Sequence, residues 1–571
     1  MAETYETYKV LGFKRKFKLT KRSPPQDVID LFSLCTNKEL QMSPDHFRRF
    51  LIQFQGDKDV TVDYAKGIME QALHQLRPDF AMCCFTVDDF FNFLFLDEFN
   101  GPINLEVHHD MTAPLQHYFI YTGHNSYLTG NQLIGGCSVK QIIKSLKKGV
   151  RVIELDLWPT SSKEGIHVLH GGTMTTPVEL EECLTAIKEH AFVKSPYPVI
   201  ITLEDHLTPN LRDIVAKMVT EIFGDKLYRP EAGDHNEFPS PEALKHRILL
   251  STKLPKEHLD EINGSQEDNI SNLNHDLTQL FEIDFEDENE DATNENPGQK
   301  TTPGYTQLIG IHAAKPDKKL SKALTVESGK AKRLSLGEQT LERAASLYGT
   351  DLVRFTQKNI LRVYPKGTRI TSTNFKPLRA WMHGVQMVAF NMQGYGKSLW
   401  MMHGMFRSNG KCGYVKKPDF LMSRSPDDEV FEPKPKVPLD VKKTLKVRVY
   451  MGDGWRKDFS QTHFDKYSPP DFYTKLYMVG VPADVRKVRT REIIDDWIPI
   501  WNQEFSFPLT VPELALLKIV VREHDAGKDD FAGQTCFPVS ELKPGIRVVR
   551  LRDKKGKKFK SVKLLMQFTL E

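Results

Sequence analysis

Acidic side chains interrupt or follow two apolar runs in the first half of the chain. In Arg151–Trp158, Glu154 and Asp156 alternate with aliphatic residues, so an extended chain would place both carboxylates on one face. The apolar run Val199–Leu203 ends in a third acid, Glu204. Two carboxylates on one face of an apolar strand are costly to bury unpaired. The pattern therefore predicts strands that carry acids to a functional site.

Two histidines and an asparagine follow further predicted strands. Strand Tyr118–Thr122 runs into His124 and Asn125, and strand Ile166–Leu169 ends in His170. Polar groups at the carboxyl ends of successive strands are typical of the catalytic face of a (β/α) barrel. Each residue taken alone is more often an ordinary loop or surface residue. Their succession within about eighty residues of chain favours a catalytic site.

Four of these strand-end residues offer amide or carboxylate oxygens and no sulfur. They are Asn125, Glu154, Asp156 and Glu204. Such a set suits Ca²⁺, which takes about 6–8 oxygen ligands and leaves positions for water and substrate. We therefore predict Ca²⁺ as the cofactor. His124 and His170 then remain for proton transfer or for charge stabilisation.

The composition is that of a globular protein with several domains. The 571 residues are 40% hydrophobic and 27% charged, with a net charge of +3, so three or four domains are expected. Seven scattered cysteines without metal spacing are typical of a reducing compartment. No signal peptide and no apolar run near 18 residues is present. We expect a cytoplasmic protein that contacts membranes peripherally.

Residues 1–106 have the apolar spacing of helices, as in Val28–Leu34 and Phe90–Phe95. A basic arm, Lys9–Arg22, precedes these helices. The arm can bind an anionic membrane, at about 1 kcal/mol for each basic residue near the surface, or it can be a solvated strand or helix. The sequence leaves both possibilities open. No EF-hand calcium loop is present, so no Ca²⁺ is expected in this lobe.

Residues 107–254 and 304–432 alternate predicted strands and helices, which is typical of a parallel sheet. We interpret them as two halves of one (β/α)8 barrel. Residues 255–303 separate the halves, and we expect this acidic segment to be disordered. Strand Arg247–Leu250 brings Lys253 to the same rim as the acids.

Residues 433–571 consist of short alternating runs separated by turns, which predict an all-β sandwich. Acidic residues gather in two of the turns. They are Asp465 and Asp471 in one turn, and Glu523, Asp525 and Asp530 in the other. This arrangement resembles a C2 domain, whose end loops bind Ca²⁺ and dock on acidic lipid. We predict these five residues as its ligands, with the alternative that they only solvate turns.

The motifs together resemble one known family. HNSYLTGNQL, GVRVIELDLW, HGG and LEDH are similar to the X region of eukaryotic phosphoinositide-specific phospholipase C, and ILRVYPKGTR and VQMVAFNMQ to its Y region. The chain resembles the short plant form without a pleckstrin-homology domain. The resemblance implies a split TIM-like barrel, an EF-hand-like helical lobe and a C2 β-sandwich.

The resemblance also implies an activity. It is the Ca²⁺-dependent hydrolysis of phosphatidylinositol 4,5-bisphosphate to diacylglycerol and inositol 1,4,5-trisphosphate through a cyclic phosphodiester, in phosphoinositide signalling. His124 would stabilise the transition state, His170 would protonate the leaving glycerol oxygen, and Glu154 or another carboxylate would accept the proton of the attacking hydroxyl. The residues expected to contact the inositol ring and its phosphates are Lys253, Ser335, Arg362 and Tyr364.

One departure from the family concerns substrate choice. Members often have a lysine where Ser251 stands, so we predict that the enzyme also accepts phosphatidylinositol 4-phosphate. The expected partners are the phosphoinositide substrate and an anionic membrane surface, without nucleic acid. We expect a monomer that acts at the plasma membrane.

Two other classes of protein share parts of this pattern. A glycerophosphodiester phosphodiesterase has the barrel, the metal and the paired histidines, but it would not need Arg362 or a C2 domain. A catalytically inactive lipid-binding scaffold would keep the fold but usually with a broken site. Here both histidines and all four oxygen ligands are present.

Overall fold

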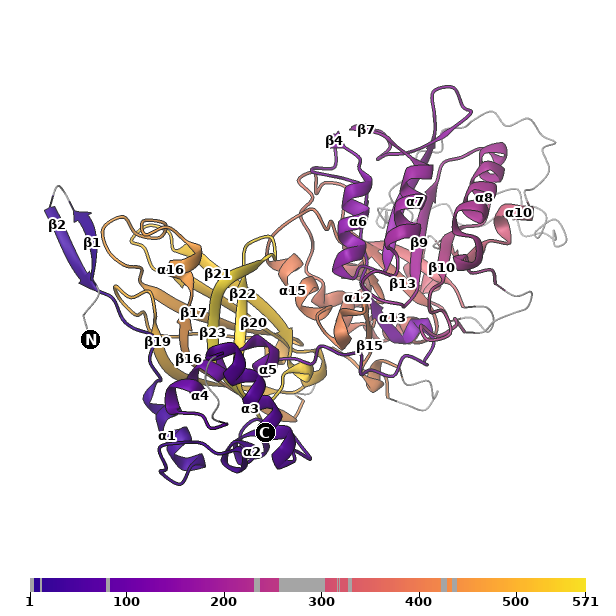
Figure 1. Cartoon of the computed structure of the whole chain (residues 1–571). Helices are drawn as coiled ribbons and strands as arrows, with labels where there is room; N and C mark the ends of the chain where they lie inside the picture. Colours follow the sequence, from indigo (N-terminus) through magenta and orange to yellow (C-terminus); the bar gives the residue numbers. More distant parts are fainter. Residues whose placement is uncertain are drawn as a thin grey trace. The chain divides into compact units, whose positions relative to one another are not determined.

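The computed structural model divides into two compact units, which are described separately (Figure 1). One comprises Glu106–Met402 and Asn409–Pro433, and the other comprises Met1–Leu105, His403–Ser408 and Lys434–Glu571. The residues that the structure describes are 5–10, 13–78, 83–230, 237–255, 303–315, 317, 319–326, 331–422, 429–433 and 439–571. Most of the predicted acidic linker, residues 256–302, lies outside the described residues.

Eight parallel strands form a closed barrel in the first unit. In order around the sheet they are β3 (Tyr118–Ile120), β14 (Met387–Val388), β13 (Ile360–Tyr364), β12 (Arg333–Gly337), β11 (Ile309–Ala313), β10 (Ile248–Lys253), β9 (Val199–Asp205) and β5 (Val152–Pro159). A parallel bridge between Thr122 and Val152 closes the ring, and the Gly123 N–H donates to the Val152 carbonyl oxygen at 3.0 Å. The predicted barrel of two sequence halves is therefore confirmed.

Helices alternate with the barrel strands along the chain. They are α6 (Val139–Lys148), α7 (Leu180–His190), α8 (Pro209–Phe223), α10 (Pro303–Thr306), α11 (Leu320–Ala323), α12 (Glu338–Leu347), α13 (Gly349–Lys358), α14 (Leu378–Met382) and α15 (Lys397–Met405). In α6 the Ser138 hydroxyl accepts the Lys140 N–H, and Gly149 ends the helix at φ 102°. These signals set the length of the crossover that leads into the acidic strand β5.

The prediction of a barrel strand before His170 is wrong. Residues Ile166–Val168 form β6, which pairs antiparallel with β5, and β8 (Val178–Glu179) pairs antiparallel with β6. A second extension joins β4 (Ile134–Gly136) to β7 (Met174–Thr176) in parallel. His170 therefore reaches the barrel mouth on a connection between short added strands, whereas the acids come from the barrel itself.

The second unit contains an eight-stranded antiparallel β-sandwich. Its strand order is β18 (Arg486–Arg489), β17 (Phe472–Val479), β20 (Leu516–Glu523), β21 (Asp530–Pro538), β22 (Gly545–Arg552), β23 (Lys558–Leu570), β16 (Lys443–Asp453) and β19 (Ile500–Leu509). Alternate residues of the strands face inward and pack around Trp455, Trp501 and Phe472. The predicted sandwich is confirmed.

The N-terminal lobe shares a hydrophobic core with the sandwich. Its helices are α1 (Gln26–Cys35), α2 (Pro44–Gln53), α3 (Val62–Leu76), α4 (Val87–Leu94) and α5 (Asp97–Asn100). Phe47 and Phe90 lie in one cluster with Tyr450 and Ile546 of the sandwich. The buried Gln55 amide bonds both the N–H and the carbonyl oxygen of Ile546. The lobe is thus a structural part of this unit.

The basic arm begins in a β-hairpin, so the structure selects a strand over a helix here, while membrane binding by the arm stays a prediction. Strand β1 (Tyr5–Val10) pairs antiparallel with β2 (Phe13–Lys18). Among the described residues, no helix is long and apolar enough to cross a membrane.

Candidate active site at the barrel mouth

Three carboxylates meet at the carboxyl ends of two neighbouring barrel strands. Glu154 and Asp156 lie on β5, and Glu204 lies on β9 directly beside Asp156 in the parallel register. One oxygen of each lies within 4.8 Å of the others. The backbone N–H of Asn125, at φ 41°, donates to Glu154 Oε2 at 3.1 Å. The structure therefore brings all four predicted oxygen ligands together.

The electrostatics of this cluster favour a bound cation. Burial raises the pKa of Asp156 well above its usual range, and the charges of Glu204 and Glu154 raise it further. Burial also acts to raise the pKa of Glu204, but the hydrogen bond and charge of His206 outweigh it and the pKa is lowered. Asp156 Oδ2 accepts the Tyr127 hydroxyl at 2.5 Å, while its Oδ1 is buried without a partner among the described residues. A hard cation that uses Asp156 Oδ1 would fit this set.

The predicted phosphate contacts come from strands on another part of the same rim. Ser335 on β12 lies opposite Arg362 on β13, and Tyr364 follows on β13 with its ring 5.3 Å from the guanidinium. Lys253 ends β10 and is exposed. Arg362 is buried and forms an ion pair with Glu154. The structure therefore links the predicted phosphate contacts to the acid cluster through the ion pair of Arg362 with Glu154.

Hydrogen bonds define which nitrogen of each histidine faces the site. Asn391 donates its amide Nδ2 to the Thr373 carbonyl oxygen at 3.3 Å, so its Oδ1 accepts from His124 Nδ1 at 3.0 Å. His170 Nδ1 donates to the Gln132 carbonyl oxygen at 2.7 Å. In both rings the proton lies on Nδ1, and Nε2 remains for substrate. Burial lowers the pKa of His124, which favours a neutral ring before substrate binds.

Gln132 connects the histidines to the predicted calcium ligands. Its Oε1 accepts the amide Nδ2 of Asn125 at 3.1 Å, which leaves Asn125 Oδ1 for a cation. Its Nε2 donates to Ser372 Oγ at 2.8 Å and to Asn391 Oδ1 at 3.1 Å. Its backbone carbonyl holds His170, as described above. Gln132 lies within the motif HNSYLTGNQL, but the sequence alone did not predict a role for it.

Two further positioning residues were missed. Tyr127 orients Asp156 through its hydroxyl, and His206 contacts Glu204 Oε1 through Nε2 at 3.2 Å. The His206 ring stacks on Trp158 with centroids 3.9 Å apart and planes 15° apart. Their only sequence signals were position: Tyr127 lies in the same motif as His124 and Asn125, and His206 follows Glu204 by two residues.

The predicted calcium ligands of the sandwich lie at one end of it but are less tightly grouped. Among the described residues, Glu154, Asp156 and Glu204 are the only all-acidic group whose ligand atoms lie within 4.8 Å of one another. Burial raises the pKa of Glu523 to about 8, and the nearby charges of Asp471 and Asp525 add to it. The members of this set are Asp465, Asp471, Glu523, Asp525 and Asp530, and their role stays a prediction.

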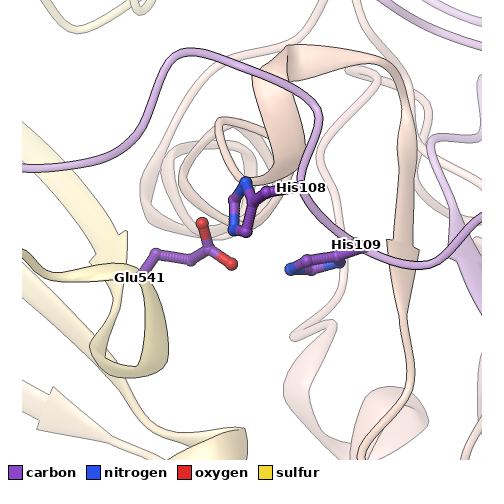
Figure 2. A group of neighbouring side chains, drawn as sticks. All are labelled: His108, His109 and Glu541. Carbon is purple, nitrogen blue, oxygen red and sulfur yellow. The ribbon is translucent and has the colours of Figure 1, made fainter.

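Figure 2 shows His108 and His109, whose rings meet edge to face with centroids 4.7 Å apart. Both backbone N–H groups donate to Asn409 Oδ1, at 2.8 and 2.9 Å, so this pair anchors the start of the barrel unit. Glu541, also labelled, belongs to the other compact unit. We assign no metal site to these three residues.

One mouth of the closed barrel holds a cluster of acids, two oriented histidines and a buried arginine, and the chain also carries a C2-like sandwich. These features are those of a phosphodiesterase of the TIM-barrel class. Residues 111–254 match the X domain of phosphatidylinositol-specific phospholipase C, residues 306–420 match its Y domain, and residues 443–553 match the C2 domain. The chain belongs to the phosphatidylinositol-specific phospholipase C family.

Plant relatives match along almost the whole chain. Phosphoinositide phospholipase C 6 of Arabidopsis thaliana is 54% identical over 593 residues, which cover 98% of this chain and 96% of the relative. Human 1-phosphatidylinositol 4,5-bisphosphate phosphodiesterase delta-1 is 32% identical over 478 residues, which cover 81% of this chain and 61% of the relative. The crystal structure of L. pealei PLC21 has a TM-score of 0.74 at 24% identity, covers 96% of this chain and 68% of that chain, and supports the fold.

Proposed function

We propose that this protein hydrolyses phosphatidylinositol 4,5-bisphosphate, and also the 4-monophosphate, to diacylglycerol and an inositol phosphate in a Ca²⁺-dependent reaction at an anionic membrane. The supporting observation is the single rim that holds the acid cluster, both histidine Nε2 atoms and Arg362. Relatives named phosphoinositide phospholipase C support the same activity. The signalling role follows from the trisphosphate product.

The predicted calcium ligands have the chemistry that the reaction requires. Ca²⁺ held by Asn125, Glu154, Asp156 and Glu204 would lower the pKa of the inositol 2-hydroxyl and neutralise charge at the phosphoryl group. Glu154 or another of the three carboxylates accepts the proton of that hydroxyl, which attacks the neighbouring phosphorus to give a cyclic phosphodiester.

The two histidines have different roles at the reacting phosphorus. His124 would stabilise the oxygen on which negative charge develops by donating from Nε2 as the imidazolium, the form that the anionic substrate favours, while its Nδ1–H stays bonded to Asn391. The imidazolium form of His170 would give its Nε2 proton to the leaving glycerol oxygen. The neutral ring, with Nδ1–H still on the Gln132 carbonyl oxygen, would then accept a proton at Nε2 from the water that opens the cyclic product. Arg362 and Lys253 supply fixed positive charge to the ring phosphates.

Hydrolysis assays on three substrates, the bisphosphate, the 4-monophosphate and a glycerophosphodiester, test this proposal. We expect the purified protein to hydrolyse the bisphosphate and the 4-monophosphate in vesicles, and to leave a water-soluble glycerophosphodiester untouched. Preferred turnover of the glycerophosphodiester would instead favour the other barrel phosphodiesterases. Vesicle binding without turnover of any phosphoinositide would favour an inactive scaffold.

Replacing Ser251 by lysine is expected to raise the preference for the bisphosphate over the 4-monophosphate. Ser251 is fully buried and its hydroxyl donates to the Ile311 carbonyl oxygen at 3.1 Å, so it brings the ring phosphates no charge. A lysine at 251 would lie on the same side of β10 as Lys253. One added charged hydrogen bond is worth about 1.5–3 kcal/mol, or roughly tenfold or more in the ratio of kcat/KM on the two lipids. An unchanged ratio in the folded variant would show that residue 251 does not face the ring phosphates.

The double substitution Asp471→Asn with Asp525→Asn is expected to weaken Ca²⁺-dependent binding to anionic vesicles. A C2 site needs several carboxylates to hold the cation, and these two side chains contribute negative potential at Glu523. Vesicle sedimentation across a Ca²⁺ titration measures the effect. If the Ca²⁺ dependence is retained in full, these loops are not the calcium sensor.

A further inference from the structure

The N-terminal hairpin has two chemically different faces. The register pairs Lys9 with Lys14, Thr7 with Lys16, and Tyr5 with Lys18. Because directly opposed residues share a face, Lys9, Lys14, Lys16 and Lys18 form one surface, which we call the lysine face. All four lysines are exposed. Glu6, Tyr8 and Phe17 lie on the other face and are buried.

The buried face is fixed to one end of the sandwich. Glu6 forms an ion pair with Arg456 and accepts the Trp497 indole N–H at 3.1 Å. Tyr8 is only 2% exposed, and its ring packs against Phe17 with centroids 5.4 Å apart. The hairpin is therefore an oriented element, and Figure 1 shows it standing out from the sandwich.

Further anchors come from the loops on either side of the acidic site. The Gln461 side chain donates to the Thr7 carbonyl oxygen at 3.1 Å, and the Thr20 hydroxyl donates to Asp496 at 2.8 Å. Gln461 lies in the connection that also carries Asp465. The anchoring loops and the predicted calcium loops thus lie at the same end of the sandwich.

The lysine face carries an electrostatic cost that an anionic partner would remove. Lys9 and Lys14 are directly opposed, and like charges in such a pair destabilise a two-stranded ribbon. Among the described residues, no carboxylate pairs with Lys9, Lys14 or Lys16. Phe13 is 79% exposed, but it pairs with Val10 and therefore lies on the opposite face from the lysines. A cluster of exposed basic residues on one oriented face fits an anionic lipid surface.

We propose that the lysine face of the hairpin is a second membrane-docking surface, which binds anionic lipid without Ca²⁺ at the same end of the unit as the calcium loops. The inference rests on the proposed action at membranes. Glu6 and Tyr8 hold the lysines in a fixed orientation, so docking does not carry the entropic cost of ordering a flexible tail.

The test compares two triple variants with equal change in charge. One carries Lys9→Gln, Lys14→Gln and Lys16→Gln. The matched control carries the same substitution at three exposed lysines elsewhere in this unit, Lys38, Lys58 and Lys443. Sedimentation with phosphatidylcholine vesicles that contain phosphatidylserine is measured in EGTA, which removes the contribution of the calcium loops.

The hairpin variant should bind about a hundredfold more weakly in EGTA, since each basic residue near the surface contributes roughly fivefold. The control should bind nearly as well as the wild type, and added salt should reduce the difference between them. Equal losses in both variants, or no loss in the hairpin variant, would overturn the proposal. Unchanged vesicle binding with lost binding to a DNA duplex would assign the face to nucleic acid and would also overturn it.

A single variant tests the orientation separately. Glu6→Gln removes the ion pair with Arg456 but makes the protein more positive, so a simple charge effect would strengthen vesicle binding. The proposal expects weaker binding, because the lysines lose their fixed orientation. Stronger or unchanged binding would overturn the claim that the ribbon is held for docking.

The proposed catalytic function is tested apart from the hairpin. Hydrolysis of a short-chain, monomeric phosphatidylinositol 4,5-bisphosphate by the wild type requires no vesicle. A failure in that assay would count against the catalytic proposal, while the vesicle comparison would still decide the role of the hairpin.

Discussion

Replacing His124 or His170 by alanine, or Glu204 by glutamine, is expected to remove most phosphoinositide hydrolysis while the protein remains folded. The histidines present Nε2 to the site from a rim of the barrel and not from its core, and Glu204 is one of the three clustered acids. A lost proton-transfer group costs roughly 10²–10⁴ in rate. Steady-state kcat and kcat/KM on vesicles measure the effect, and the melting temperature reports the fold.

A histidine outside the mouth provides the control. His190 ends α7, and its Nδ1 bonds the Ala186 carbonyl oxygen within the same helix. His190→Ala should keep nearly full activity. Near-normal turnover by a folded His124→Ala or His170→Ala protein would contradict the assigned site.

Gln132→Leu is expected to reduce both activity and the affinity for activating Ca²⁺ by about 10–100-fold, the usual cost of losing a residue that orients metal ligands. The variant removes the amide that holds Asn125 and Asn391, and through Asn391 the His124 ring. The Ca²⁺ concentration at half-maximal rate should rise while kcat falls. Calorimetric titration of Ca²⁺ gives a readout that does not depend on turnover.

Two further variants test whether Gln132 acts by orienting its neighbours or only by packing against them. Gln132→Glu keeps an acceptor for Asn125 but cannot donate to Ser372 or Asn391, so it should lower kcat more than it alters Ca²⁺ affinity. Gln339→Leu, at an exposed position of α12, is the matched control and should behave as wild type. Wild-type kcat and Ca²⁺ dependence in Gln132→Leu would contradict the connecting role.

The sequence was sufficient to predict the acid cluster and the barrel. Alternation in Arg151–Trp158 placed Glu154 and Asp156 on one face, and the parallel register then set Asp156 beside Glu204. The strand β12 was not predicted as an element, because Arg333 interrupts its apolar pattern although the side chain is buried. β6 was interpreted as a barrel strand, since a short apolar run does not reveal whether its partner is parallel or antiparallel.

The orientation of the site could not be predicted in the same way. Gln132 donates to Asn391, which is 259 residues away in the chain, so neither motif alone shows the contact. The N-terminal hairpin could not be predicted from the sequence either. Its lysines are compatible with a strand or a helix, and the contacts of Glu6 with Arg456 and Trp497 are what select the strand pair.

We propose that the barrel mouth cleaves phosphoinositides in a Ca²⁺-dependent reaction in which the 2-hydroxyl of the inositol attacks the neighbouring phosphorus. The most direct measurement is product analysis after the purified protein meets phosphatidylinositol 4,5-bisphosphate vesicles, with Ca²⁺ and with EGTA. We expect diacylglycerol, inositol 1,4,5-trisphosphate and some cyclic phosphodiester with Ca²⁺, and none of them with EGTA. Equal turnover in EGTA, or hydrolysis of an analogue that lacks the 2-hydroxyl, would contradict this proposal.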